Sequence, residues 1–380
     1  MLEKNSLTCQ LSKDKNFEEL FNIKKFPIYM GTIKKNFNVK LMNLKFHINK
    51  KTGTVQIFPR VPLKKLYFKS HNSGKIGNIW KDHHTQFNNL IKKYLRGTIV
   101  EIGGGHNSIT SIPIKSSKIK IYSFDPNINK NKNKNIIKIK TFISEKEMKK
   151  NFIPKVDLFI HSHLLEHIYD PLNFLNLIKK NIKNDGMHVF SVPNIKVMIK
   201  KKYVNAMNFE HPYYLEENII DKLLALAGFK IIKKFYFRND HSIFYLTKKK
   251  KTNKTKKLKF KNDYIKNKRL FLNLYNYWIN DVKQINKKIK NLDNNSVFMF
   301  GAHIFSQSLL CLGLDYRKIK CILDNDKDKQ NEILYGTNFQ VKSPKILRNL
   351  KNPTVILRAN AYNAEIIKDI HSINKNCNII

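Results

Sequence analysis

Cysteine is scarce in this 380-residue chain, and its four residues lie far apart. Cys9, Cys311, Cys321 and Cys377 form no CxxC pair, which argues against a disulfide framework and a cysteine-based zinc site. No apolar run reaches the roughly 18 residues that a membrane-spanning helix needs. The N-terminal residues also lack the apolar stretch of a signal peptide. We therefore expect a cytoplasmic protein with no membrane span.

Arginine is scarce as well, although the chain is strongly basic. Its 72 Lys and Arg residues and 28 Asp and Glu residues give a net charge of +44, and only seven of the basic residues are arginine. Proteins that read phosphates tend to use arginine, because its planar guanidinium binds two oxygens at once. Lysine, asparagine and isoleucine share A/T-rich codons, so genome composition explains this charge better than nucleic-acid binding does. We expect no specific nucleic-acid partner, and an RNA-binding or RNA-modifying protein remains the least favoured alternative.

Strand-like apolar runs alternate with helical patterns in the middle of the chain. Hydrophobic residues make up 42% of the sequence, which suits a globular protein of two or three domains. Alternating strands and helices predict an α/β fold with a mostly parallel, Rossmann-like sheet covered on both faces. The predicted strands are 98–102, 119–124, 156–160 and 187–192, followed by an antiparallel pair at 229–238 and 241–247.

The sequence divides into four parts. Residues 1–95 read as a small N-terminal lobe, irregular except for strands near 38–46 and 54–58 and a helix at 79–94. Residues 96–247 form the first α/β domain, and residues 248–292 form a basic linker with a long helix at 263–290. Residues 293–380 predict a second, smaller Rossmann-like α/β domain, with strands at 297–300, 319–323 and 354–358.

A glycine-rich loop follows the first strand of the α/β domain, in the text VEIGGGHNS at 100–108. Glycines there let the backbone approach a ligand without a Cβ in the way. A second strand ends in Asp125 about twenty residues later, where an acid can accept hydrogen bonds from ribose hydroxyls. The third glycine of a GxGxxG motif is missing, so these residues alone indicate a nucleoside-containing ligand only weakly.

The next strand makes the pattern more specific. It reads VDLFIHSHLLEHIYDPLNFL at 156–175, and it resembles the fourth motif of class I S-adenosylmethionine-dependent methyltransferases. The later DGMHVFSVPN at 185–194 resembles their next strand motif. The resemblance implies S-adenosylmethionine as the cofactor. The residues expected to bind it are Glu101, Gly103, Gly104, Gly105, Asp125, Pro126, His163 and Leu164.

Two classes of methyltransferase do not fit these motifs. The N6-adenine enzymes carry a [DNS]PP[YFW] motif after the fourth strand, where this chain has His161-Ser162-His163. The C5-pyrimidine enzymes attack the ring with a thiolate, and no cysteine lies between residues 10 and 310. Methylation of a small molecule on oxygen, nitrogen or carbon remains.

Three further segments resemble sugar-nucleotide C-methyltransferases of deoxysugar pathways. They are TGTVQIFPRVPLKKLYFKS at 52–70, MNFEHPYYL at 207–215, and the C-terminal text at 298–344. The acceptor implied by this resemblance is a 4-keto-6-deoxy sugar on a nucleoside diphosphate. The family's leading lobe holds zinc with paired cysteines that this chain lacks, so we expect a degenerate lobe without metal. Asn208 stands where C-methylating members often have Tyr, so an O- or N-methyltransferase of a surface-polysaccharide or other small-molecule precursor remains the alternative.

The same resemblance suggests the catalytic residues. His211 is the candidate base that removes the proton next to the ketone, since histidine titrates near neutral pH. Glu210 is expected to orient it, and Tyr67 and Tyr214 are expected to donate to the oxyanion or to position the sugar. The sequence leaves the oligomeric state open.

Overall fold

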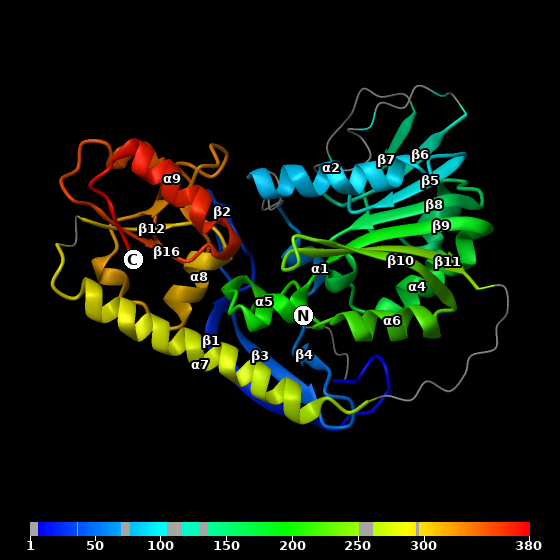
Figure 1. The fold of residues 1–380 in the computed structure, drawn as a ribbon, viewed down its shortest axis with the longest axis horizontal. Coiled ribbons are helices and arrows are strands. Elements are labelled where there is room, and N and C mark those ends of the chain that lie inside the picture. The colour runs from blue at the N-terminus through cyan, green and yellow to red at the C-terminus, as the bar shows by residue number, and fades with distance from the viewer. Residues whose placement is uncertain are drawn as a thin grey trace.

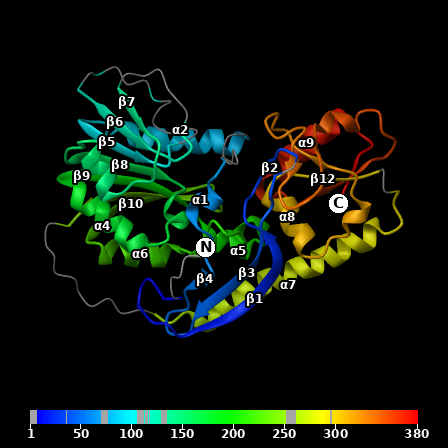
Figure 2. The ribbon, with the colours of Figure 1, turned by 180° about the vertical axis from the view of Figure 1, so that it is seen from behind.

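Two α/β domains lie at opposite ends of the molecule, and a small N-terminal sheet and one long helix connect them (Figures 1 and 2). The computed structural model describes residues 7–35, 37–69, 77–104, 112, 116, 118–128, 135–250, 261–293 and 296–380. Within these ranges, no helix has both the length and the apolarity needed to cross a bilayer.

The larger domain is built on a seven-stranded sheet in the order β10-β11-β9-β8-β5-β6-β7. The five strands from β9 to β7 are parallel, and β11 and β10 close the sheet as an antiparallel pair. The predicted Rossmann-like α/β fold is therefore confirmed. The strands are β5 (Thr98–Ile102), β6 (Lys120–Phe124), β7 (Ile136–Ile139), β8 (Val156–Ser162), β9 (Ile182–Pro193), β10 (Phe229–Phe237) and β11 (Ser242–Lys249).

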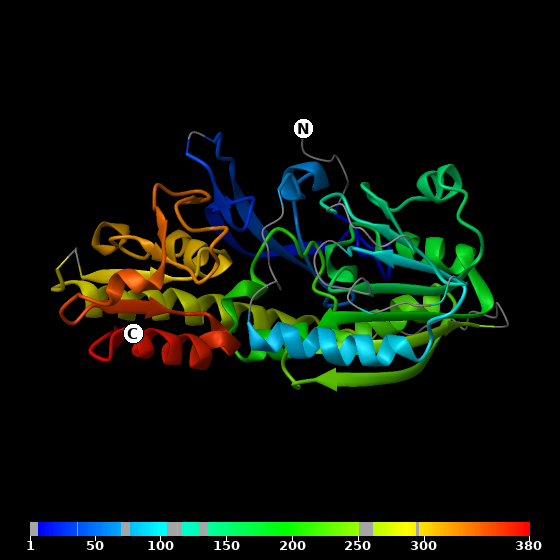
Figure 3. The same cartoon turned by 90° about the horizontal axis from the view of Figure 1, so that it is seen from above.

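Helices cover both faces of this sheet. On one face lies α2 (Asn78–Lys92) (Figure 3). Its side chains Ile79, Phe87 and Ile91 pack against the apolar side chains of the strands. The other face carries α3 (Glu145–Lys150), α4 (Pro171–Asn181) and α6 (Glu217–Leu226). The sequence placed α2 in the N-terminal lobe, but its apolar face packs on the sheet of the larger domain.

The N-terminal lobe is a three-stranded antiparallel sheet of β1 (Phe17–Pro27), β3 (Leu41–Asn49) and β4 (Val55–Ile57), followed by the short helix α1 (Leu63–Leu66). The sequence missed β1. Its pairing with β3 shifts register between Glu19 and Phe21 and again between Ile23 and Phe26. These irregularities break the alternation of apolar and polar residues that marks a strand.

The C-terminal domain is a parallel sheet in the order β15-β13-β12-β16-β17, as the sequence predicted for a second Rossmann-like unit. Its short extra strand β14 (Ile333–Leu334) pairs with β2 (Thr32–Ile33) and so joins this domain to the N-terminal lobe. The sheet strands are β12 (Val297–Phe300), β13 (Ile322–Leu323), β15 (Val341–Lys342), β16 (Thr354–Leu357) and β17 (Asn378–Ile379). The helices are α8 (Ile304–Cys311) and α9 (Asn363–Ile373).

The long helix α7 (Tyr264–Ile289) shares one hydrophobic core with its neighbours. Phe271, Leu274 and Trp278 belong to the same buried cluster as side chains of β3 and β12. The segment predicted as part of a linker therefore packs against two domains. Tyr277, the neighbour of Trp278 in the chain, is 45% exposed. The helix α5 (Ile195–Lys200) packs on α7, and short 3-10 turns cover Leu165–His167, Val204–Ala206, Tyr316–Lys318, Pro344–Leu347 and Asn360–Tyr362.

Candidate active site

A cleft of about 1020 Å³ lies between the two α/β domains. Both sheets present the carboxyl ends of their strands to it. Gly103, Asp125 and His163 follow β5, β6 and β8 of the larger domain, while Gly301 and Asp324 follow β12 and β13 of the smaller one. Ligands of open parallel sheets bind at this edge, where the chain reverses its direction of winding. In the larger sheet that point lies between β5 and β8, which are neighbours.

The loop after β5 requires glycine. Gly103 has φ = 78°, a left-handed conformation, and its N–H donates to the carbonyl oxygen of Phe124 at 2.8 Å. A Cβ on Gly104 would lie 2.3 Å from a carboxylate oxygen of Glu101 and 2.5 Å from the Ser123 hydroxyl. The backbone here leaves no room for a side chain, as expected of a loop that passes beneath a ligand.

Glu101 supports this loop from within the sheet. Its carboxylate accepts a hydrogen bond from the Ser123 hydroxyl at 2.7 Å, and the residue is only 1% exposed. Glu101 does not line the cleft, so any effect on a ligand would act through the loop. Gly105 lies outside the described residues.

Asp125 and Pro126 line the cleft at the end of β6. One carboxylate oxygen of Asp125 accepts the backbone N–H of Asn127 at 2.6 Å. The amide of Asn127 in turn donates to the carbonyl oxygen of Tyr67 at 3.2 Å. These contacts tie the acidic turn to the N-terminal lobe.

His163 and Leu164 form the turn after β8, and both line the cleft. His163 has φ = 48°, and its N–H donates to the carbonyl oxygen of Ser191 at 2.9 Å. A Cβ on Gly103 would lie 3.4 Å from the Leu164 side chain, so Leu164 borders the glycine loop. The predicted cofactor residues of β6 and β8 therefore meet at one edge.

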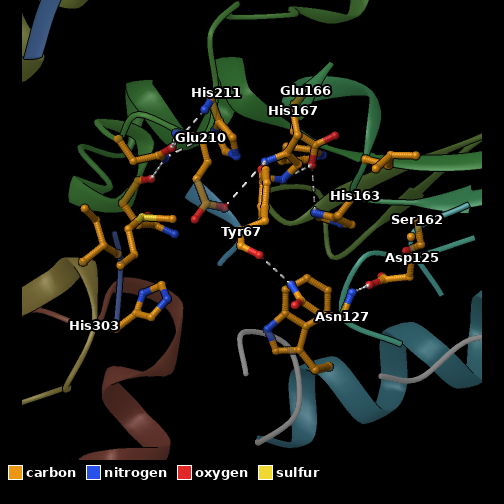
Figure 4. Close-up of a pocket in the computed structure, with 18 of the residues that line it drawn as sticks. Tyr67, Asp125, Asn127, Ser162, His163, Glu166, His167, Glu210, His211 and His303 are labelled. Atoms are coloured by element: carbon orange, nitrogen blue, oxygen red, sulfur yellow. Dashed lines mark hydrogen bonds and ion pairs between the residues drawn. The ribbon is translucent and has the colours of Figure 1, made fainter. Parts of the chain in front are cut away.

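A polar cluster lies beside this edge (Figure 4). The hydroxyl oxygen of Tyr67 lies 2.8 Å from Nδ1 of His167, and a carboxylate oxygen of Glu210 lies 3.6 Å from the same nitrogen. Glu166 Oε1 lies 3.8 Å from Nε2 of His167. The ring centroid of His211 lies 4.8 Å from that of His167. His167 is at the centre of this cluster, a role that the sequence did not indicate.

Asn208 fixes the turn that carries Glu210 and His211. Its side-chain oxygen accepts the backbone N–H groups of Glu210 and His211, at 2.8 and 3.0 Å. The amide nitrogen of Asn208 lies 3.5 Å from Nδ1 of His211, too far to fix the tautomer of the ring. The residue that departs from the sugar-methylating pattern thus holds the candidate base in position.

Burial sets the charge of the cluster. Desolvation raises the pKa of Glu166 to about 8. Desolvation and the neighbouring His167 together lower the pKa of His211 to about 3. Near neutral pH, Glu166 therefore holds its proton, and His211 is neutral and able to accept one. Burial, reinforced by Glu210, keeps the pKa of Tyr67 well above its usual value, so its hydroxyl remains a donor.

Tyr214, predicted as a catalytic residue, lies outside the cleft. It is 2% exposed, its ring packs against Phe46 and Phe271, and its hydroxyl donates to the carbonyl oxygen of Ala206. The hydroxyl of its neighbour Tyr213 donates to the carbonyl oxygen of Tyr169 at 2.9 Å. The structure places Tyr67, but neither of these two tyrosines, at the cleft.

The edge of the C-terminal sheet is held by Asp324. One of its carboxylate oxygens accepts the backbone N–H of Ala302 at 2.8 Å, which closes the loop after β12. Nζ of Lys329 lies 3.6 Å from the same oxygen. Asp324 lines the cleft while it holds this loop.

In the N-terminal lobe, Cys9 packs against two threonine hydroxyls. Its sulfur lies 3.4 Å from the Thr52 hydroxyl and 3.3 Å from the Thr54 hydroxyl, and all three residues are buried. Thr52 also donates to the side-chain oxygen of Asn49 at 2.9 Å. Thiol and hydroxyl contacts hold this part of the lobe, and the absence of a metal here stays a prediction.

Comparison with known proteins identifies the larger domain. Residues 79–234 match the sequence profile of a family described as a methyltransferase domain. The chain contains a methyltransferase domain. The match begins at α2, in agreement with the packing of that helix on the sheet. No curated protein sequence shows significant similarity to the chain.

Several solved methyltransferases are similar to the methyltransferase domain. The N-methyltransferase NodS from Bradyrhizobium japonicum WM9 is 12% identical, with a TM-score of 0.33, over 46% of this chain and 97% of that chain. A putative S-adenosylmethionine-dependent methyltransferase from Listeria monocytogenes is 13% identical, with a TM-score of 0.33, over 44% of this chain and 100% of that chain. Human N-acetylserotonin methyltransferase in complex with SAM is 16% identical, with a TM-score of 0.36, over 45% of this chain and 53% of that chain.

S-adenosylmethionine is the cofactor of the methyltransferase domain, and the predicted cofactor is confirmed. The geometry at the carboxyl edge fits it. Gly103 lines the cleft without a side chain, and Asp125 presents a carboxylate at the end of the next strand. His163 and Leu164 form the opposite wall. Which of these residues bind the cofactor directly remains a prediction.

Proposed function

We propose that the protein transfers a methyl group from S-adenosylmethionine to a carbon atom of a nucleoside-diphosphate ketosugar. The observation that carries the proposal is the cluster of Tyr67, His167, Glu210 and His211 at the cleft, beside the carboxyl edge that carries Asp125. A base, a carboxylate next to it and a phenol donor are what enolate formation from a ketone requires.

His211 is the base in this proposal. Burial lowers its pKa to about 3, so the ring is neutral near neutral pH but a weaker base than an exposed histidine. The charge of Glu210 raises this pKa and favours transfer of the proton from the carbon next to the ketone to His211. The carboxylate of Glu210, on the adjacent residue, stabilises the imidazolium that results. The Tyr67 hydroxyl donates to the oxygen that becomes negative. When bound, S-adenosylmethionine supplies an electrophilic methyl group.

The second sheet supports a nucleotide-bearing acceptor. Gly301 and Asp324 put a second strand-to-loop edge of nucleotide-binding type on the opposite wall of the same cleft. Lys69, Lys180 and Lys329 line the cleft as well. Each is paired with a carboxylate, so a diphosphate would compete with that carboxylate for the cation. In this arrangement the sugar lies against the methyltransferase domain and the nucleoside against the C-terminal domain.

A second candidate is O- or N-methylation of a surface-polysaccharide or other small-molecule precursor. Asn208 favours it, because this residue replaces the tyrosine frequent in C-methylating members and its side chain is committed to the backbone of residues 210 and 211. The fold and the cofactor are the same in both proposals, and the acceptor atom distinguishes them.

The test is a mass-shift assay with a panel of nucleotide sugars, with and without a 4-keto group, each incubated with the protein and S-adenosylmethionine. The proposal expects one added methyl group on a 4-keto sugar. The NMR spectrum of the product should show that this methyl group is bonded to carbon. A methyl group on oxygen or nitrogen would support the second candidate. No methylation of any ketosugar in the panel would contradict the proposal.

A further inference from the structure

Three histidines from distant parts of the sequence meet at the wall of the cleft. His83 comes from α2, His163 from the turn after β8, and His241 from the turn between β10 and β11. One ring nitrogen from each lies within 4.8 Å of the other two. His163 and His241 line the cleft. We propose that these three imidazoles bind a divalent transition-metal ion, with Zn²⁺ the best match.

His83 provides the first independent support. It is 0% exposed, and within the described ranges neither of its ring nitrogens has a hydrogen-bond partner. A buried imidazole normally pairs both nitrogens, because leaving a polar group without water or a partner costs free energy. A metal ion bound by one ring nitrogen would remove part of this deficit.

Ser242 shows where two of the rings converge. Its hydroxyl oxygen lies 2.7 Å from Nε2 of His163 and 2.6 Å from Nδ1 of His241. Both nitrogens point at the Ser242 oxygen, so an ion bound by them has to displace this hydroxyl. In a tetrahedral zinc site with Zn–N distances near 2.0 Å, ligand nitrogens are about 3.3 Å apart. The three nitrogens have to move closer together to reach that spacing from the 4.8 Å limit.

Glu166 supplies the outer partner that metal-binding histidines usually have. Its Oε1 lies 3.5 Å from Nδ1 of His163 (Figure 4). The other ring nitrogen of His163, Nε2, contacts Ser242. Metal-bound histidines commonly donate their second N–H to an oxygen acceptor, which orients the ring. The carboxyl group of Glu166 offers such an oxygen even with its proton in place. Glu166 is 4% exposed, and its position assigns Nε2 of His163 to the metal.

Three protein ligands leave one coordination position, and the site borders the cleft. Such an open position takes water or an oxygen atom of a bound molecule. The inference does not depend on the identity of the methyl acceptor. A second group, Glu166, His167 and His211, also brings possible metal ligands together, so the experiment must distinguish the two groups.

The experiment uses the full-length protein without a histidine tag, stripped with a chelator and titrated with ZnCl₂ by calorimetry and with CoCl₂ by visible absorption. We expect one ion per chain and the cobalt spectrum of four-coordinate nitrogen and oxygen ligation. His241 lies in a partly exposed turn. The loss of an outer-shell partner alone lowers metal affinity by roughly 10–100-fold. His241→Ala removes a ligand and should weaken zinc binding by at least as much. His211→Ala is the control and should bind the ion as the wild type does.

X-ray absorption of the zinc-loaded wild type provides a measurement that no folding defect of a variant can affect. It should count three imidazole ligands and no sulfur. The proposal is overturned if no stoichiometric ion binds, if sulfur is found, or if His241→Ala binds with wild-type affinity. Loss of binding in folded His211→Ala would also overturn it, because it would assign the ion to the other group.

Discussion

The hydroxyl of Tyr67, at the end of α1, is hydrogen-bonded to Nδ1 of His167, 100 residues later in the chain. A residue of the N-terminal lobe thus completes a polar cluster whose other members belong to the methyltransferase domain. We expect Tyr67→Phe to lower kcat by roughly 10–100-fold with a smaller change in KM, because it removes a donor to the developing oxyanion. Steady-state kinetics with the accepted sugar measures this.

Tyr213→Phe is the matched control for that variant. Its hydroxyl also donates a hydrogen bond, to the carbonyl oxygen of Tyr169, but Tyr213 itself does not line the cleft. It should lose about 1 kcal/mol of unfolding free energy and keep its turnover. Equal losses of kcat in the two variants would show that Tyr67 acts only through stability.

Asp125→Ala should abolish the binding of S-adenosylmethionine, measured by calorimetry, because this carboxylate is the acid at the end of β6 that faces the cleft. Asp324→Ala makes the same change at the corresponding edge of the other sheet. It should leave the affinity for S-adenosylmethionine within about twofold of the wild type, which is less than 0.5 kcal/mol. Unchanged binding in Asp125→Ala would place the cofactor elsewhere.

Trp278→Ala tests the core that α7 shares with the N-terminal and C-terminal parts. Trp278 is 2% exposed, and its truncation should cost about 3–5 kcal/mol of unfolding free energy. Tyr277→Ala, one residue earlier, removes a side chain that is 45% exposed and should change stability by less than about 0.5 kcal/mol. Denaturant unfolding compares the two, and similar losses would mean that α7 does not pack as described.

His188 makes stability depend on pH. It is 0% exposed, its Nε2 lies 3.0 Å from that of His161, and burial lowers its pKa to about 3. In the unfolded chain this histidine titrates near its usual pKa of about 6.5. Between these two pKa values the unfolded state binds one more proton than the folded state. His188 therefore lowers the free energy of unfolding by about 1.4 kcal/mol for each unit by which the pH falls.

The variant His188→Gln should therefore unfold with a shallower pH dependence than the wild type from about pH 6.5 down to about pH 3. Denaturant titrations at several pH values measure the slope, and the difference should correspond to one proton. An unchanged slope would show that His188 is protonated in the folded protein.

The parts of the fold that the sequence predicted well are strands buried on both faces. Strands such as β5 and β12 are short apolar runs followed by glycine, so the sequence shows where each of them ends. The strand β1 was missed because its two register shifts interrupt the apolar alternation. The role of α7 was also missed, since its apolar stripe does not reveal which domains it contacts.

The site was predictable only where its residues follow a strand or belong to one motif. Asp125 and His163 follow β6 and β8, and the topology brings such positions to one edge. Tyr214 shares a motif with His211, but its side chain points into the core, which no sequence spacing shows. The contact of Tyr67 with His167 and the meeting of three histidines from 83 to 241 depend on tertiary packing alone.

The most direct test of the proposed C-methylation compares proton exchange next to the ketone in the wild type and in His211→Ala. Wild type and variant are incubated in D₂O with a nucleoside-diphosphate 4-keto-6-deoxy sugar, and deuterium next to the ketone is followed by NMR. S-adenosylmethionine binding is measured on the same samples. We predict that the wild type exchanges this position, and that His211→Ala binds the cofactor normally but loses both exchange and methyl transfer. Retained exchange and turnover in His211→Ala would contradict the account.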